Sequence, residues 1–162
     1  MAAEANAALI SKFYTAFATG KADEMAAMYA PHATFKDAAF DLKNGNETGS
    51  MWKMLTSRSK NFSLTFSNVK GTETGGSADW VANYLFGGKN MVENHVHSEF
   101  TIENGLIVKQ IDTFDFHKWA SQALGTVGWL FGWLPAMHTR VRNTAMGQLK
   151  TYMEKNQQPP AS

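Results

Sequence analysis

The sequence predicts an α+β fold in which three N-terminal helices cover a cone-shaped, curved antiparallel sheet, followed by a C-terminal helical extension. Two features support this prediction. Apolar residues recur at helical spacing near the N-terminus, and from Phe62 onward the apolar period falls from about 3.6 to about 2 residues. Helices followed by a run of strands are typical of a sheet covered on one face. With 162 residues, the chain is long enough for one domain with its own core.

The N-terminal part is expected to contain three helices and one short strand. Leu9, Phe13 and Phe17 define one helical face, and Gly20 ends that helix. Pro31 interrupts the next helical pattern within YAPHA. The expected elements are a first helix ending at Gly20, a second over residues 22–29, a strand over 33–37 and, after the loop DLKNGNETG, a third helix over about 50–57.

The middle of the chain alternates apolar and polar residues, which predicts four antiparallel strands in a meander. FSLTFSNV places Phe62, Leu64 and Phe66 on one face, and ENG marks a tight hairpin before the last strand. The expected strands cover residues 62–69, 77–86, 91–102 and 106–116. The concave side of such a sheet leaves an open-ended pocket that suits a small molecule.

Beyond the strands, the sequence predicts helices over residues 117–124 and 137–155. They flank the segment GWLFGWLP, residues 128–135, which is too short and too broken by glycine for a spanning helix of about 20 apolar residues. Three roles are open for its aromatic side chains. They close the open end of the cone, extend a dimer contact, or pack as core against the last helix.

Composition excludes several classes of function. Lys plus Arg number 15 and Asp plus Glu number 14, so the charge balance indicates no nucleic-acid partner. The chain contains no cysteine, which excludes thiolate metal sites and a thiol nucleophile. The N-terminus lacks a basic region followed by an apolar run, so we expect a cytoplasmic protein with no membrane partner. The chain contains no glycine-rich phosphate-binding motif, so the sequence predicts no nucleotide cofactor.

Two stretches of the chain resemble the nuclear transport factor 2-like superfamily, and within it the SnoaL-like and ketosteroid-isomerase-like proteins. They are FYTAFATGKADEMAAMYAPHATFKD and FTIENGLIVKQIDTFD. The resemblance covers about residues 8–116 and implies the cystatin-like fold of that superfamily. It divides the chain into a single SnoaL-like domain over residues 1–156, with a core over about 8–116 and an extension over 117–155, and a disordered tail over 157–162.

The resemblance also points to catalytic residues. Asp37, in ATFKD, looks like the carboxylate that serves ketosteroid isomerases as a proton-shuttling base. Asp112, in GLIVKQID, is similar to the aspartate that SnoaL-type cyclases carry on their last strand as acid and base. The tyrosine of the isomerases falls on Phe13, with Tyr14 displaced by one position, and their protonated aspartate falls near Ser98.

Alternation along the last strand places Asp112 on the face of Val108, Gln110 and Phe114, which the resemblance puts inside the cone. A carboxylate among apolar side chains has a raised pKa, as a general acid or base near neutral pH requires. The alternative is a hydrogen-bonded rim residue or a dimer contact. Asp37 has an alternative role as a turn residue that caps the following loop.

His95 and His97 lie on the more polar face of their strand, together with Glu93 and Glu99. Alternation therefore predicts that both histidines point away from the core, on a face that suits a dimer interface. The resemblance instead places His97 near a partner position of Asp112, which a β-bulge would allow. No third ligand is evident beside the two histidines, so no metal site is predicted.

The sequence thus predicts a SnoaL-like protein that binds an apolar or partly polar small molecule and forms a homodimer through the outer sheet face. As an enzyme it would be an isomerase, cyclase or hydratase/hydrolase without a cofactor. The alternatives are a non-catalytic ligand-binding or dimeric scaffold protein, and an accessory domain that recognises a protein partner. The candidate catalytic residues are Asp112, Asp37 and His97, and the candidate ligand-binding residues are Tyr14, Phe17, Tyr29, Trp52, Ser98, Gln110 and Phe114.

Overall fold

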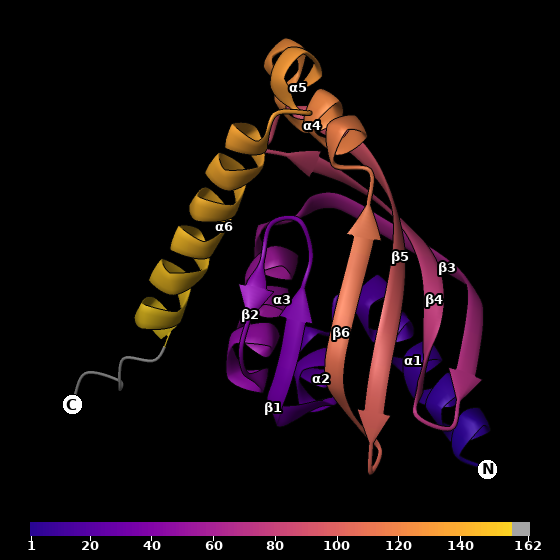
Figure 1. Ribbon diagram of the computed structural model, residues 1–162. Helices are drawn as coiled ribbons and strands as arrows, with labels where there is room; N and C mark the ends of the chain where they lie inside the picture. Colours follow the sequence, from indigo (N-terminus) through magenta and orange to yellow (C-terminus); the bar gives the residue numbers. More distant parts are fainter. Residues whose placement is uncertain (157–162) are drawn as a thin grey trace.

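A curved six-stranded sheet is packed against three N-terminal helices, and a C-terminal arm of helices crosses one end of it (Figure 1). The computed structural model describes residues 1–156. The predicted α+β class with a curved sheet is confirmed. The tail predicted over residues 157–162 lies outside the described residues.

The N-terminal helices are α1 (Ala2–Ala18), α2 (Ala22–Ala27) and α3 (Gly45–Arg58). Helix α1 ends just before Gly20, which has a positive φ of 71°. Helix α3 begins at Gly45, five residues earlier than predicted, because the Asn44 side chain accepts a hydrogen bond from the Glu47 amide at 2.8 Å. The stretch predicted as a loop is therefore in part the capped first turn of a helix.

The sheet has the strand order β2-β1-β6-β5-β4-β3, and β3 to β6 form the predicted antiparallel meander. Strand β1 lies parallel to β6, so the sheet is mixed and not wholly antiparallel as predicted. This pairing joins two segments that are far apart in the chain, so its direction cannot be predicted from the local hydrophobic period of either strand. The strands are β1 (Tyr29–Lys36), β2 (Asp41–Leu42), β3 (Lys60–Thr72), β4 (Gly75–Phe86), β5 (Asn90–Glu103) and β6 (Leu106–Phe114).

A register shift near the start of β6 changes which residues face the core. The pairing of β5 with β6 is irregular between Thr101 and Ile102. As a result Ile107 is fully buried and Val108 is only half-buried, the reverse of the predicted alternation. From Gln110 onward the alternation is regular and agrees with the prediction that Gln110 and Asp112 face inward.

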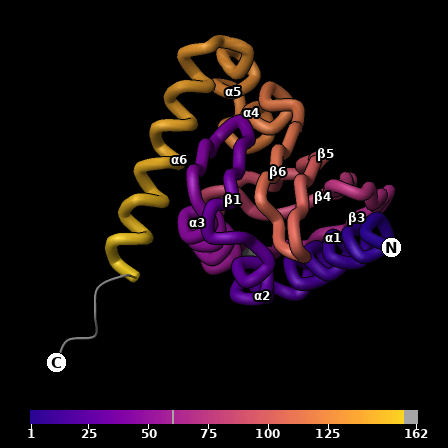
Figure 2. Tube along the Cα trace, turned by 60° about the horizontal axis from the view of Figure 1, so that its bottom comes forward, coloured from indigo at the N-terminus to yellow at the C-terminus, as the bar shows by residue number. Residues whose placement is uncertain are grey.

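The C-terminal arm consists of α4 (Phe116–Leu124), α5 (Thr126–Phe131) and α6 (Pro135–Asn156). Helix α6 contacts α3, and its buried anchor is Leu149 in the C-terminal half. Figure 2 shows α6 running beside α3. Among the described residues, no helix is long and apolar enough to cross a membrane.

The aromatic segment between α4 and α6 is exposed, so the expectation that it packs as core is wrong. Trp129 and Trp133 are 63% and 67% exposed, whereas Gly128 is buried against α4. A side chain at Gly128 would lie 1.8 Å from the Ala120 carbonyl oxygen. The glycine thus allows the close approach of α5 to α4 while the neighbouring side chains point outward.

Candidate functional site

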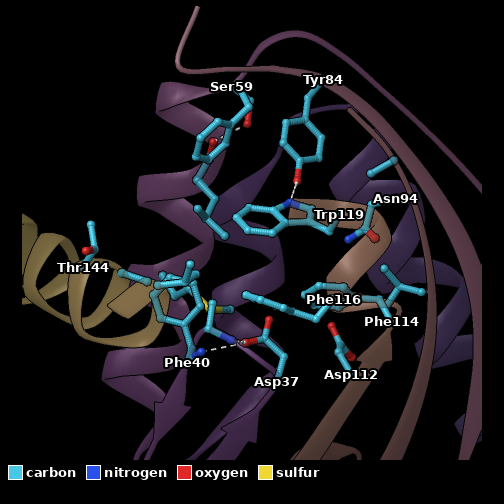
Figure 3. Close-up of a pocket in the computed structure, with 18 of the residues that line it drawn as sticks. Asp37, Phe40, Ser59, Tyr84, Asn94, Asp112, Phe114, Phe116, Trp119 and Thr144 are labelled. Atoms are coloured by element: carbon cyan, nitrogen blue, oxygen red, sulfur yellow. Dashed lines mark hydrogen bonds between the residues drawn. The ribbon is translucent and has the colours of Figure 1, made fainter. Parts of the chain in front are cut away.

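A cavity of about 590 Å³ lies between the concave side of the sheet, α3 and the C-terminal arm (Figure 3). Its walls are mainly apolar, which suits a ligand with a large hydrophobic surface. The larger apolar side chains of the wall include Phe17, Phe40, Trp52, Phe62, Trp80, Phe86, Phe114, Phe116, Trp119 and Met137.

Two carboxyl groups reach the same end of this cavity. Figure 3 shows the side chains of Asp37 and Asp112 next to each other below the apolar part of the pocket. Their neighbourhood follows from the parallel pairing of β1 with β6, in which Lys36 is opposite Ile111. Asp37 and Asp112 are the next residues along the two chains, and adjacent strands lie only about 4.8 Å apart. The site therefore holds a pair of carboxyl groups.

One oxygen of Asp112 is occupied by two donors from the core. Ser98 Oγ donates to Asp112 Oδ1 at 2.5 Å, and Gln110 Nε2 donates to the same atom at 3.0 Å. Ser98 Oγ also accepts hydrogen bonds from Tyr14 Oη at 2.7 Å and Trp80 Nε1 at 2.8 Å. Because both acceptor positions of the hydroxyl are filled, its single proton is directed to Asp112.

The amide of Gln110 is oriented in the same manner. Trp52 Nε1 donates to Tyr29 Oη at 2.8 Å, and Tyr29 donates in turn to Gln110 Oε1. The side-chain amide is thus held with its nitrogen toward Asp112. No buried side-chain polar atom in the described part of the chain lacks a partner, and both bonds to Asp112 end on Oδ1. Oδ2 is therefore the oxygen that Asp112 presents to the cavity.

Asp37 is held by its own loop. The amides of Ala39 and Phe40 each donate to Asp37 Oδ1 at 2.7 Å, and the Asp37 amide donates to the Phe40 carbonyl at 2.9 Å. These bonds give Asp37 the alternative role that the sequence predicted, that of a turn residue that caps the following loop. The same carboxyl also lines the cavity, so the two roles coexist in one side chain.

Burial raises the pKa of both carboxyl groups from the ordinary value of 3.8. For Asp112 the pKa rises to about 7, opposed by the hydrogen bonds from Ser98 and Gln110 and increased further by the charge of Asp37. For Asp37 it rises to about 6, opposed by the two loop amides and by Arg142. Near neutral pH the pair can therefore hold one protonated and one ionised member, which an acid–base reaction requires.

The predicted ligand-binding residues fall into two groups. Phe17, Trp52 and Phe114 line the cavity, as both aspartates do. The remaining four do not line it and instead form the buried hydrogen-bond network behind Asp112. These four residues are Tyr14, Tyr29, Ser98 and Gln110. They were predicted to contact ligand, whereas in the structure they lie behind the cavity and hold the Asp112 carboxyl that lines it.

His97 is not a partner of Asp112. The pairing of β4 with β5 is regular past this residue, so no bulge reverses its direction. His97 points to the outer face, where its Nδ1 lies 2.6 Å from Asp79 Oδ1. The neighbouring His95 is also exposed and bonds to Glu93 at 2.7 Å. Alternation therefore predicted the facing of both histidines correctly, and the pairing of His97 with Asp112 was wrong.

The cavity has further polar lining residues that sequence reasoning did not assign to it. Tyr84 and Asn94 lie on the inward faces of β4 and β5, and Tyr84 Oη accepts a hydrogen bond from Trp119 Nε1 at 2.8 Å. Alternation on these strands could have identified both. Arg140 on α6 also lines the cavity. Nothing in the local sequence indicates where α6 docks.

No group of three or more His, Cys, Asp or Glu residues within the described chain could hold a metal ion. The cavity instead combines apolar walls with two carboxyl groups, one of them oriented by a fully partnered network. Such an arrangement can add a proton to one position of a bound molecule and remove one from another.

Comparison with known proteins gives a consistent family assignment. A family model described as the SnoaL-like domain matches residues 10–110. No curated protein matches the chain significantly.

Solved structures share the fold at low sequence identity. An LEH-like epoxide hydrolase from M. tuberculosis superposes with a TM-score of 0.65 at 16% identity, over 79% of this chain and 96% of that one. A putative polyketide cyclase from a Silicibacter species gives 0.64 at 19% identity, over 75% and 97%. A nuclear transport factor 2-like protein of unknown function from Burkholderia pseudomallei gives 0.64 at 13% identity, over 74% and 97%.

Proposed function

The chain belongs to the SnoaL-like domain family, and from this premise we propose that it is a cofactor-independent acid–base enzyme acting on an apolar or partly polar small molecule. One observation carries the proposal. Asp112 Oδ1 is saturated by two oriented donors, so its other oxygen is left to face an apolar cavity beside the carboxyl of Asp37. A purely structural aspartate would not leave one oxygen directed into an apolar cavity.

The two carboxyl groups would divide the acid and base roles between them. Burial raises the pKa of Asp37 to about 6 and that of Asp112 to about 7, and the two groups interact, so one proton shared by the pair leaves one carboxyl ionised as general base and the other protonated as general acid. Asp112 acts on the substrate through Oδ2, the oxygen left by the bonds to Oδ1. Removal of a proton at one position and addition at another is the common step of isomerisation, cyclisation and hydration.

The cavity defines the substrate class. A volume of about 590 Å³ with aromatic and aliphatic walls suits a molecule with a large apolar frame. The reacting group lies at the end where the two aspartates meet, and Tyr84, Asn94 and Arg140 offer polar contacts elsewhere in the cavity. An epoxide hydrolase and a putative polyketide cyclase among the similar structures are consistent with an apolar substrate that bears a polar reactive group.

Non-catalytic ligand binding is the second candidate, favoured by the engagement of Asp37 in its own loop through the amides of Ala39 and Phe40. A binder would use the same cavity, and its affinity for a neutral ligand would not depend on either carboxyl. We also propose a homodimer through the outer sheet face, where Met91 and Ile111 are 57% and 37% exposed.

Proton transfer can be measured before the natural substrate is known. We would incubate the protein in D₂O with β-tetralone, an apolar ketone with acidic hydrogens, and with styrene oxide as a hydration probe. Binding is followed by quenching of tryptophan fluorescence, since Trp52, Trp80 and Trp119 line the cavity. We expect catalysed deuterium exchange or diol formation with a probe that binds. Asp112→Asn and Asp37→Asn should each lower the rate by about 100-fold or more while binding is retained.

The matched control is Asp41→Asn, an aspartate next to the same loop but exposed and paired with Lys43, which should react as wild type does. Probes that bind without any catalysed proton transfer would support the non-catalytic candidate. A rate that is unchanged in both the Asp112 and Asp37 variants would contradict the proposed roles.

A further inference from the structure

Five apolar side chains project into solvent from helix α5 and the residues just after it. We call this group the α5 tip. It consists of Val127, Trp129, Leu130, Phe131 and Trp133, which are 45–67% exposed. In the described chain these five make up most of the large apolar side chains that are exposed, and they lie within seven consecutive residues. A concentration of this kind marks an interaction surface.

The α5 tip is held in place by close packing and by hydrogen bonds within the arm. Gly128 packs against the Ala120 carbonyl of α4 so closely that a side chain there would clash. Trp133 Nε1 donates to the Leu130 carbonyl at 2.9 Å, and the Trp129 carbonyl lies 2.9 Å from His117 Nε2. These two bonds hold Trp133 Nε1 and the Trp129 carbonyl within the arm, and the exposed surface of the tip is mainly apolar.

The C-terminal arm differs from the rest of the chain in its charge. No charged residue occurs over residues 119–139, and the flanking charges Lys118, Arg140 and Arg142 are all positive. Residues 117–162 contain five Lys or Arg and one Glu, a net charge of +4, whereas residues 1–116 contain ten basic and thirteen acidic residues, a net charge of −3. Such asymmetry favours an anionic surface as the partner of the arm.

We propose that the α5 tip docks on the surface of an anionic lipid bilayer. Its tryptophans, leucine and phenylalanine would enter the boundary between headgroups and acyl chains, where tryptophan is favoured. Arg140 is the sixth residue of α6. It thus lies about 8 Å along the helix axis from the tip, within reach of lipid phosphates. The mode is surface docking, since no described helix is long and apolar enough to span a membrane.

The shape of the arm favours a lipid surface over a second copy of the chain. In Figure 1 the α5 tip stands at one extremity of the molecule, beyond the sheet and the other helices. A convex projection needs a concave apolar partner in another protein, whereas a bilayer accommodates it without one. The tip also adjoins the cavity, because Leu124, Val127 and Met137 line the end nearest to it. A bound tip would therefore bring the cavity close to apolar molecules dissolved in the membrane.

Vesicle binding tests this proposal without reference to catalysis. The full chain is sedimented with phosphatidylcholine vesicles that contain or lack phosphatidylserine. We expect binding that requires phosphatidylserine and falls by about ten-fold or more in the Trp129→Ser/Trp133→Ser double variant. Each of Arg140→Gln and Arg142→Gln should weaken binding by about five-fold. Lys12→Gln, which removes one positive charge from the exposed side of α1, is the matched control and should bind as wild type does.

Circular dichroism establishes that each variant is folded, and the replaced tryptophans are exposed enough for the fold to tolerate serine. Absence of wild-type binding to phosphatidylserine vesicles would overturn the proposal, as would equal binding by the double tryptophan variant. Sedimentation velocity tests the alternative partner of the tip, a second copy of the chain. A dimer that dissociates on the double tryptophan substitution, together with no vesicle binding, would assign the tip to a second copy of the chain.

Discussion

Replacement of Asp112 by asparagine should change how the stability of the protein depends on pH. The variant keeps an oxygen at the position of Oδ1, so the hydrogen bonds from Ser98 and Gln110 have an acceptor. It removes the carboxyl that burial makes costly to ionise. Any difference in pH dependence between the two proteins therefore reports the ionisation of Asp112 and its charge interaction with Asp37.

The size and sign of the effect follow from the raised pKa. In the unfolded chain Asp112 loses its proton near the ordinary value of 3.8, whereas the folded protein retains the proton up to about pH 7. The stability due to protonated Asp112 is complete below about pH 4 and is lost as the pH rises through 7. A rise from 3.8 to about 7 corresponds to roughly 4 kcal/mol in the free energy of unfolding.

The measurement is urea unfolding at a series of pH values, followed by tryptophan fluorescence. The stability of Asp112→Asn relative to wild type should rise by up to about 4 kcal/mol between about pH 4 and pH 8. Asp37, whose pKa is also raised, contributes its own pH dependence to both proteins, so the difference reports Asp112 together with its charge interaction with Asp37. The exposed Asp41→Asn variant serves as the control. Parallel pH profiles for wild type and Asp112→Asn would refute the reasoning.

Three further substitutions test separate parts of the structure. Ser98→Ala leaves two buried donors without an acceptor and should cost about 2 to 5 kcal/mol in urea unfolding; a loss below 1 kcal/mol would contradict the network. Gly128→Ala should lower Tm because its Cβ clashes with Ala120, whereas Gly147→Ala on α6 has free space and should stabilise by about 1 kcal/mol. Ile111→Asp should convert the proposed dimer to a monomer in sedimentation velocity, and a monomeric wild type would contradict that dimer.

The strands and the facing of Asp112 were predictable because both depend on local alternation. The alternation of Phe62, Leu64 and Phe66 with polar residues indicates a half-buried strand wherever its neighbours lie. The same rule predicted that Asp112 faces inward and that His97 faces outward. On the last strand the rule failed at Ile107 and Val108, where a register shift intervenes.

The composition of the site was less predictable because it depends on pairing between distant segments. Asp37 lies beside Asp112 only because β1 runs parallel to β6. The bonds from Tyr14 and Trp80 to Ser98 join α1, β4 and β5, and nothing in the sequence near any of these residues signals them. Sequence reasoning therefore selected polar residues near the cavity, but four of those it assigned to ligand contact form the network that holds Asp112 in place.

The C-terminal arm was the least predictable part. A segment as apolar as GWLFGWLP favours burial on composition alone, and the sequence left core packing, closure of the cone and a dimer contact all open for it. Its exposure results from the glycine contact between α5 and α4, which fixes the backbone and directs the large side chains outward. The docking of α6 over the cavity depends on contacts with α3 that the weak periodicity of α6 does not specify.

The protonation of the carboxyl pair is the central claim, and carboxyl-carbon NMR on isotope-labelled aspartate measures it directly in the free protein. The account predicts two aspartates that titrate far above the ordinary value, Asp37 near pH 6 and Asp112 near pH 7, each identified by its Asn variant. Asp79 and Asp41, whose pKa values are lowered by hydrogen bonds from His97 and Lys43, should titrate below the ordinary value. Titration of every aspartate below about pH 5 would contradict the account, since no carboxyl would then hold a proton in the cavity near neutral pH.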